Sequence, residues 1–108
     1  MPYVSITTAK KVDDSARERL NQEIGGIMSV LPTKNKDNTL IAIIDEVPMF
    51  KSGAPNDGVF LEVRLFKQSP EDAKKEFAQK IRAILKDVLK LGENDCLYMN
   101  YIENETWG

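Results

Sequence analysis

The stretch that decides the fold is DNTLIAII at residues 37–44, because its pattern returns as NDCLYMNY at residues 94–101. Each stretch begins with an Asn and an Asp and continues into a run of apolar and aromatic residues. The two candidate helix caps, Asp13 and Ser69, are separated by nearly the same number of residues as these two stretches are. We therefore interpret the chain as one domain, residues 1–108, in which a β-α-β unit is written twice, over about residues 2–46 and 58–103.

The first unit contains two predicted strands and one predicted helix. Tyr3–Thr8 has the composition of a short strand, and Leu40–Asp45 (LIAIID) is a strand that is apolar on both faces. Asp13 is expected to begin the helix, and Pro32 to mark its end. The apolar residues at helical spacing are Leu20, Ile24, Ile27, Met28 and Leu31.

The second unit repeats this order after residues 48–58 (PMFKSGAPNDG), which are expected to form a loop. Val59–Phe66 alternates between apolar and other residues, and Cys96–Ile102 is the last predicted strand. Ser69 is expected to cap the second helix, with Pro70 at its first position and Gly92 at its close. The apolar stripe of that helix is Phe77, Ile81, Ile84, Leu85 and Val88.

Each β-α-β unit implies two parallel strands joined by a right-handed crossover. The predicted fold class is therefore α+β, with a four-stranded mixed sheet and both helices on one face. The second face would carry Phe60, Phe66 and Tyr98, and the doubly apolar LIAIID strand is typical of a strand covered on both sides. We expect another copy of the chain to cover this face, in a homo-oligomer.

The composition excludes several classes of function. A net charge of -2 argues against a nucleic-acid partner, and no apolar run approaches the ~18 residues of a membrane span. The N-terminus lacks a basic segment followed by an apolar stretch, so we expect no signal peptide and a cytoplasmic protein. Cys96 is the single cysteine and histidine is absent, which leaves no disulfide framework, no His-ligated metal and no His general base. We expect no metal and no cofactor.

Four segments give the chain a resemblance to a known family. They are the MPYV start, MFKSG at residues 49–53, LYMNY at residues 97–101 and the pair Trp107-Gly108. Together they resemble the tautomerase superfamily, in the branch of macrophage migration inhibitory factor and the phenylpyruvate tautomerases. The resemblance implies a homotrimer and an isomerase that interconverts keto and enol groups of a small acid. The Cys-x-x-Cys pair of the animal cytokines is absent from residues 59–62, so cytokine behaviour is not carried over.

The resemblance also implies roles for individual residues. Pro2 would be the catalytic base, and Lys36, with Lys34 as a close rival, would bind the substrate carboxylate. Arg64 could bind that carboxylate instead, although an ion pair with Glu62 or Asp45 is the first expectation for it. The remaining substrate-binding residues implied by the resemblance are Phe66 and, from a neighbouring subunit, Tyr98 and Asn100.

The chemistry of keto-enol tautomerisation is compatible with an N-terminal proline as the catalytic base. Removal of Met1 would leave Pro2 as a free secondary amine, and an α-amine titrates near ~8 in model peptides. Burial and nearby cations lower that pKa toward the range that general acid-base catalysis needs. With Met1 retained, the Pro2 nitrogen is an amide, and the chain would be a non-catalytic trimeric ligand-binding relative. A dehalogenase or decarboxylase that uses Pro2 is the other alternative, and the sequence leaves the physiological substrate open.

Overall fold

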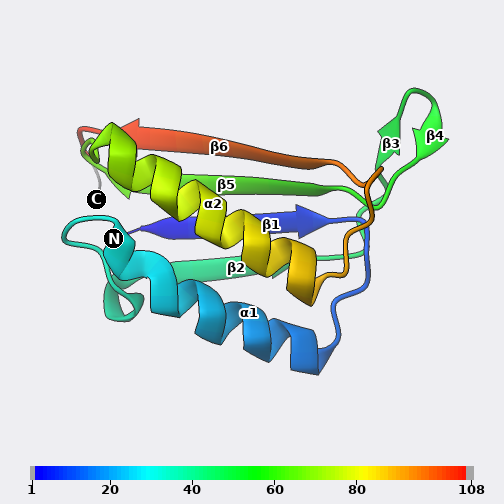
Figure 1. Cartoon of the computed structure of the whole chain (residues 1–108), viewed down its shortest axis with the longest axis horizontal. Coiled ribbons are helices and arrows are strands. Elements are labelled where there is room, and N and C mark those ends of the chain that lie inside the picture. The colour runs from blue at the N-terminus through cyan, green and yellow to red at the C-terminus, as the bar shows by residue number, and fades with distance from the viewer. Residues whose placement is uncertain (1, 107–108) are drawn as a thin grey trace.

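The computed structural model describes residues 2–106, so Met1 and the Trp107-Gly108 pair of the resemblance lie outside the described part of the chain. Two helices lie across one face of a four-stranded sheet, and a small hairpin projects beyond one end of that sheet (Figure 1). Within residues 2–106 neither helix has the length and apolar character needed to cross a membrane. The elements are β1 (Tyr3–Thr8), α1 (Asp14–Ile27), β2 (Leu40–Ile44), β3 (Phe50–Lys51), β4 (Ala54–Pro55), β5 (Val59–Phe66), α2 (Glu71–Val88) and β6 (Leu97–Asn104), with short 3-10 turns at Met28–Val30 and Lys36–Asn38.

The sheet has the strand order β2-β1-β5-β6. β1 is parallel to β2 and β5 is parallel to β6, while β1 and β5 run antiparallel at the centre. Each parallel pair is joined through one helix, so the β-α-β order occurs twice. The predicted α+β class, with a mixed sheet and both helices on one face, is confirmed.

The start of α1 agrees with the sequence pattern, whereas both ends of α2 differ from it. The carboxylate of Asp13 accepts a hydrogen bond from the Ala16 N–H at 2.8 Å, as expected of the cap. Pro70, not Ser69, is the N-cap of α2, and it makes no side-chain capping hydrogen bond. The Ser69 N–H donates to Glu103 Oε2 at 2.7 Å, which ties the residue before the cap to β6.

The C-terminal end of α2 also differs from the prediction. The Leu91 N–H donates to the Lys86 carbonyl at 3.1 Å, and Lys90 takes a positive φ of 53°. This is the arrangement in which one left-handed residue closes a helix. Lys90 occupies the position that glycine usually takes, and Gly92 lies two residues beyond it.

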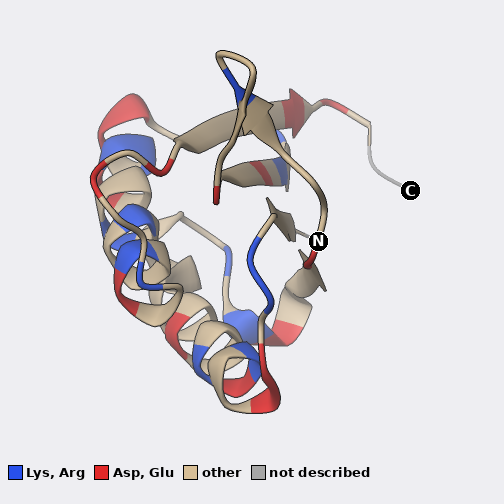
Figure 2. Cartoon of the chain, turned by 90° about the vertical axis from the view of Figure 1, so that its right-hand side faces the viewer, with Lys and Arg blue, Asp and Glu red and all other residues tan. Residues whose placement is uncertain are grey.

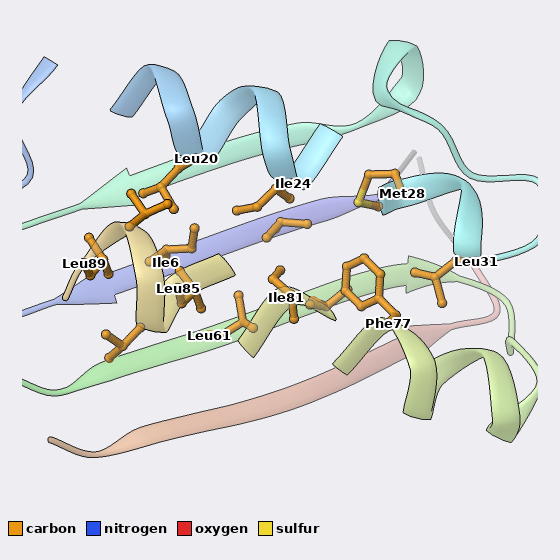
Figure 3. Packing of buried hydrophobic residues seen from close by; sticks show 14 of the residues in the cluster. Ile6, Leu20, Ile24, Met28, Leu31, Leu61, Phe77, Ile81, Leu85 and Leu89 are labelled. Atoms are coloured by element: carbon orange, nitrogen blue, oxygen red, sulfur yellow. The ribbon is translucent and has the colours of Figure 1, made fainter. Parts of the chain in front are cut away.

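The core lies between the helices and the covered face of the sheet (Figure 3). α1 and α2 contribute residues at helical spacing, and β1 and β5 contribute every second residue. Ile27 and Ile84, predicted in the stripes, are only partly buried at the margin of this core. The largest completely buried side chains are Phe77, Ile6, Leu20, Ile24, Met28, Leu31, Leu61, Leu65, Ile81, Leu85, Val4 and Val63.

The opposite side of the sheet, here called the open face, has no helix over it within the described residues (Figure 2). Leu40 and Ile44 of the LIAIID strand are 57% and 47% exposed there, and Tyr98 is 60% exposed. Exposed apolar residues clustered on one face are typical of an association surface. By strand alternation the open face consists of Tyr3, Ser5 and Thr7, Leu40, Ala42 and Ile44, Phe60, Glu62, Arg64 and Phe66, and Tyr98, Asn100, Ile102 and Asn104.

Residues 48–58 are not a simple loop, because they contain the β3–β4 hairpin. Phe50 pairs with Pro55 and Lys51 pairs with Ala54. The two residues between these strands, Ser52 and Gly53, have φ values of 54° and 80°. Two successive positive φ values are characteristic of the tightest hairpin turns, in which glycine is favoured.

Candidate functional site

Pro2 lies at the edge of the sheet where β1 and β2 start and β5 and β6 end, here called the Pro2 edge. The side chain of Pro2 is buried, and its carbonyl accepts a hydrogen bond from the Leu40 N–H at 3.0 Å. β1 is a central strand, so Pro2 is flanked by β2 on one side and β5 on the other. Tyr3 pairs with Arg64 of β5. Phe66, which is two positions further along and is the last residue of β5, therefore lies at the Pro2 edge.

The structure separates the two rival lysines. Lys34 Nζ donates to the Phe66 carbonyl at 3.3 Å, and both residues line a cavity of about 350 Å³ at the Pro2 edge. Lys36 lines a different groove, against Gly25 and Gly26 of α1. A side chain at position 25 would place its Cβ 3.3 Å from the Cβ of Lys36, so glycine permits this close approach. Of the two lysines, Lys34 is the one that lies beside Phe66.

Phe66 is held from two further directions. Lys67 Nζ lies 5.1 Å from the centre of the Phe66 ring, which is within the range of a cation–π contact. The segment that follows Phe66 is anchored by Glu103 of β6, which accepts from the Ser69 N–H at 2.7 Å and from Lys74 Nζ at 2.8 Å. These contacts fix the wall of the Pro2 edge that Phe66 forms.

The Glu103 contact has electrostatic consequences. Burial alone would raise the pKa of the Glu103 carboxyl, but the hydrogen bonds from Lys74 and from the Ser69 backbone outweigh it, and the net pKa is lowered. The Lys74 pKa is raised, chiefly by its hydrogen bond to Glu103. Burial raises the pKa of Tyr101, whose hydroxyl donates to the Lys74 carbonyl at 2.7 Å. All three groups therefore keep their ordinary charge at neutral pH.

Arg64 makes the expected ion pair with Glu62. The Arg64 Nε and Glu62 Oε1 atoms are 2.8 Å apart on the open face, while Asp45 pairs with Arg17 at 3.1 Å. Arg64 is directly opposite Tyr3, one residue from Pro2. Its side chain is 45% exposed, so part of the guanidinium is accessible for an anion near the Pro2 edge.

Tyr98 lies toward the other end of the sheet, and Asn100 lies at the middle of it, level with Glu62 and Ser5. Tyr98 pairs with Phe60, and Phe60 pairs with Thr7 at the far end of β1. Five residues of strand separate Pro2 from the level of Thr7, which corresponds to about 17 Å at ~3.3 Å per residue. A single chain therefore does not bring Tyr98 to Pro2.

The edge where Tyr98 lies also carries a mainly apolar hollow, which the sequence pattern did not indicate. Its polar groups include Lys51 of the hairpin and the thiol of Cys96, which is half-buried. A signal for the hairpin was present in the Ser52-Gly53 pair. The proximity of Lys51 and Cys96 could not be predicted from the sequence, because only the tertiary fold brings these residues together.

Comparison with known proteins identifies the fold. No family model and no curated protein matches the sequence. Among solved structures, Leishmania major MIF2 is similar with a TM-score of 0.88 and 20% identity, over 100% of this chain and 92% of that one. The macrophage migration inhibitory factor-like protein of Entamoeba histolytica gives a TM-score of 0.75 and 14% identity, over 99% and 93% of the two chains. A member of the cis-3-chloroacrylic acid dehalogenase family gives 0.77 and 15%, over 98% and 78%.

These structures share the tautomerase fold, and the present chain has the same fold. The fold that the resemblance implied is therefore confirmed, since macrophage migration inhibitory factor proteins and a member of the dehalogenase family share it. Identities of 20% and below establish the fold, and they carry no residue roles.

Proposed function

We propose that this protein is a keto-enol tautomerase of the phenylpyruvate tautomerase kind, in which the Pro2 nitrogen acts as general acid and base after removal of Met1. The observation that carries the proposal is the position of Pro2. It is buried immediately before the central strand β1, at the same edge of the sheet as the cavity lined by Lys34 and Phe66. A secondary amine there meets the two conditions that lower its pKa, which are burial and adjacent cations.

In this mechanism the Pro2 nitrogen removes a proton from the enol oxygen or the α-carbon and returns it to the other atom. A base with a pKa near the operating pH can perform both steps. Lys34 binds the substrate carboxylate, and Arg64 is the second cation near that edge. Phe66 provides an apolar wall for an aryl group. Lys36, the sequence-based choice, is less favoured because it lines the groove against α1.

Tyr98 and Asn100 complete the pocket from a neighbouring chain in a homotrimer. The support for this is the ~17 Å strand separation within one chain and the exposed apolar residues of the open face. An assembly that covers the open face would bury Leu40 and Ile44, and it would bring the Tyr98 end of one copy to the Pro2 edge of the next. The site is thus proposed to exist only in the assembly.

The first test is ketonisation of enol-phenylpyruvate by protein whose mass shows that Met1 is absent. Pro2→Ala should lower kcat/KM by roughly 10²- to 10⁴-fold, the usual contribution of a positioned acid-base group. A matched control carries one extra residue ahead of Pro2, which converts its nitrogen to an amide without changing any side chain. If the control and the Pro2→Ala variant were as active as the processed protein, Pro2 would not be the base.

A mixing experiment tests the shared site. Pro2→Ala chains retain Tyr98, and Tyr98→Ala chains retain Pro2, so mixed assemblies contain some sites in which both residues are intact. Co-refolded mixtures should therefore be more active than either variant alone. Activity equal to the mean of the two variants would show that no site combines Pro2 of one chain with Tyr98 of another.

The alternative reaction in this fold is dehalogenation, which needs a cation for the carboxylate and an acidic residue to activate water. Arg64 and Glu62 are the adjacent pair of this kind on β5, and they neutralise each other at 2.8 Å. Chloride release from 3-chloroacrylate, measured beside ketonisation, distinguishes the two reactions. Chloride release without ketonisation would favour the dehalogenase.

A further inference from the structure

The cavity at the Pro2 edge lies between two loops, and each loop contributes a lysine to its lining. Lys34 belongs to the loop that follows α1, and Lys67 to the loop between β5 and α2; both loops lie at the end of the sheet where the chain starts (Figure 1). Among the described residues, the lining contains neither Asp nor Glu. Glu103, whose carboxylate contacts the second loop, is itself paired with Lys74 at 2.8 Å. The cavity therefore carries two positive charges that its own lining does not neutralise.

The backbone of each lysine is fixed by a hydrogen bond. The Lys34 N–H donates to the Leu31 carbonyl at 3.0 Å, and the Lys67 N–H donates to the Asn104 carbonyl at 2.7 Å. Lys67 also has a φ of 64°, in the left-handed region that L-residues rarely adopt. The stems of both lysines thus start from ordered backbone beside the cavity, which reduces the entropy cost of binding an anion there.

Lys67 differs from the other cations of this edge in its contacts. Lys34 Nζ donates to the Phe66 carbonyl at 3.3 Å, and Arg64 is paired with Glu62 at 2.8 Å and does not line the cavity. Within residues 2–106, Lys67 forms no ion pair, and its ammonium lies 5.1 Å from the centre of the Phe66 ring. An ammonium has three N–H donors, so a contact with one ring leaves donors for an anion.

We propose that Lys67 is a second substrate-binding residue of the Pro2 site and holds the substrate carboxylate together with Lys34. This role rests on the proposed tautomerase function. A carboxylate has two oxygens that accept hydrogen bonds, and a lysine is a point donor rather than a fork, so two lysines can supply what one arginine supplies alone. The Phe66 ring beside Lys67 provides apolar surface next to the bound charge. The cavity volume of about 350 Å³ is at the lower end of the range for small organic ligands, ~300 to 1,000 Å³.

This role has a kinetic signature. The carboxylate keeps its charge while the proton moves between the enol oxygen and the α-carbon. Its contacts are therefore equally strong in the ground state and in the transition state. Loss of such a contact raises KM and leaves kcat unchanged, whereas loss of a group that acts in proton transfer lowers kcat.

The first experiment compares Lys67→Met with the wild type, because methionine keeps the length of the side chain and removes its charge. KM for enol-phenylpyruvate should rise about three- to tenfold, between the effect of an exposed ion pair and that of a hydrogen bond to a charged group, with kcat unchanged. The enol of methyl phenylpyruvate has no carboxylate charge, so its kcat/KM should be the same for both proteins. Lys67→Arg should restore the wild-type KM. Lys80→Met, which removes an exposed lysine of α2 outside the cavity, is the matched control and should leave KM unchanged. An unchanged KM in Lys67→Met, or an equal loss with the acid and the ester, would overturn the proposal.

A binding measurement separates the role of Lys67 from the proposed reaction. 3-Phenylpropionate has the ring and the carboxylate of the substrate but no keto group, so it does not tautomerise. Calorimetry should give a Kd that Lys67→Met raises by about three- to tenfold, both in the wild type and in the Pro2→Ala background. If the wild type does not ketonise enol-phenylpyruvate but this Kd still depends on Lys67, the proposed reaction fails and the carboxylate site stands. If ketonisation is intact and the Kd is the same in the wild type and Lys67→Met, or if the wild type does not bind 3-phenylpropionate, the role of Lys67 is refuted.

Discussion

Glu103→Gln removes one negative charge from the contact that ties the end of β6 to the start of α2. In the wild type, Glu103 Oε1 is 2.8 Å from Lys74 Nζ, and Oε2 is 2.7 Å from the Ser69 nitrogen. The Glu103 and Lys74 side chains are each only 16% exposed, whereas Glu71, the other partner of Lys74, is 76% exposed. The substitution keeps the size of the side chain and leaves the Lys74 ammonium with a weaker, solvent-screened partner.

The expected loss of stability is about 1–2 kcal/mol. Hydrogen bonds to charged groups contribute ~1.5–3 kcal/mol, and the lower part of that range applies because glutamine still accepts one hydrogen bond and water reaches the pair. For a domain of this size, ~1 kcal/mol shifts the Tm by about 4–8 °C. Glu103→Gln should therefore lower the Tm by at least about 4 °C.

The effect should depend on pH in one direction. The folded-state pKa of Glu103 is lowered, so its contribution is present above the ordinary glutamate pKa and is lost as pH falls through the folded value. The difference between the wild type and Glu103→Gln should be complete at pH 7 and should shrink below about pH 4.5. The assay is urea unfolding of both proteins at pH 7, 5 and 3.5, followed by circular dichroism.

Glu76→Gln, at an exposed position of α2, is the control for the loss of one carboxylate. It should change the unfolding midpoint little at any pH. If Glu103→Gln unfolds at the wild-type urea midpoint at pH 7, the Glu103–Lys74 contact contributes no net stability. A difference that stays constant from pH 7 to pH 3.5 would mean that shape, not charge, is responsible.

Two further predictions concern α2 and the open face. Lys90→Gly should raise the free energy of unfolding by about 0.5–1 kcal/mol, because glycine adopts the left-handed conformation of this helix end without strain. Urea titration measures this free energy, and a loss of stability would contradict the explanation of the helix end. Ile44→Asp should convert the proposed trimer of 12.2 kDa chains into single chains, because it places a charge on the apolar open face. Light scattering of both proteins measures the mass, and a variant that is trimeric like the wild type would exclude Ile44 from the interface.

The fold was predictable because local patterns and topology rules agree. Alternation in Val59–Phe66 and helical spacing in both helices identified the buried residues. The right-handed crossover of each β-α-β unit then placed both helices on one face. The errors are at helix ends and in the hairpin. Ser69 has the residue type of a cap, but the helix begins one residue later, with Pro70 as its N-cap. The contact of the Ser69 N–H with Glu103, 34 residues away, is a tertiary contact that local propensity does not contain.

The candidate site was predictable only in part. The choice of Lys34 as the proposed carboxylate-binding lysine depends on the 3-10 turn at Lys36–Asn38, because Lys36 lines the groove against α1 and Lys34 lies beside Phe66. Two lysines separated by a single residue in a loop rich in polar residues give no sequence signal for this choice. Lys51 and Cys96 were not anticipated as neighbours, because one lies in a hairpin and the other before an edge strand.

The placement of Pro2 and Tyr98 explains why a site of this kind is difficult to derive from one chain. Both residues lie on the same sheet, yet the antiparallel β1–β5 pairing sends the start of β1 and the start of β6 to opposite edges. Shortening either strand would not bring them together, because the separation follows from strand direction. A pocket that needs both residues must therefore use two copies, and the surface that would join those copies is the open face, where Leu40 and Ile44 are exposed. On this argument the apolar character of LIAIID is a requirement of the site, since loss of the interface would also remove Tyr98 from Pro2.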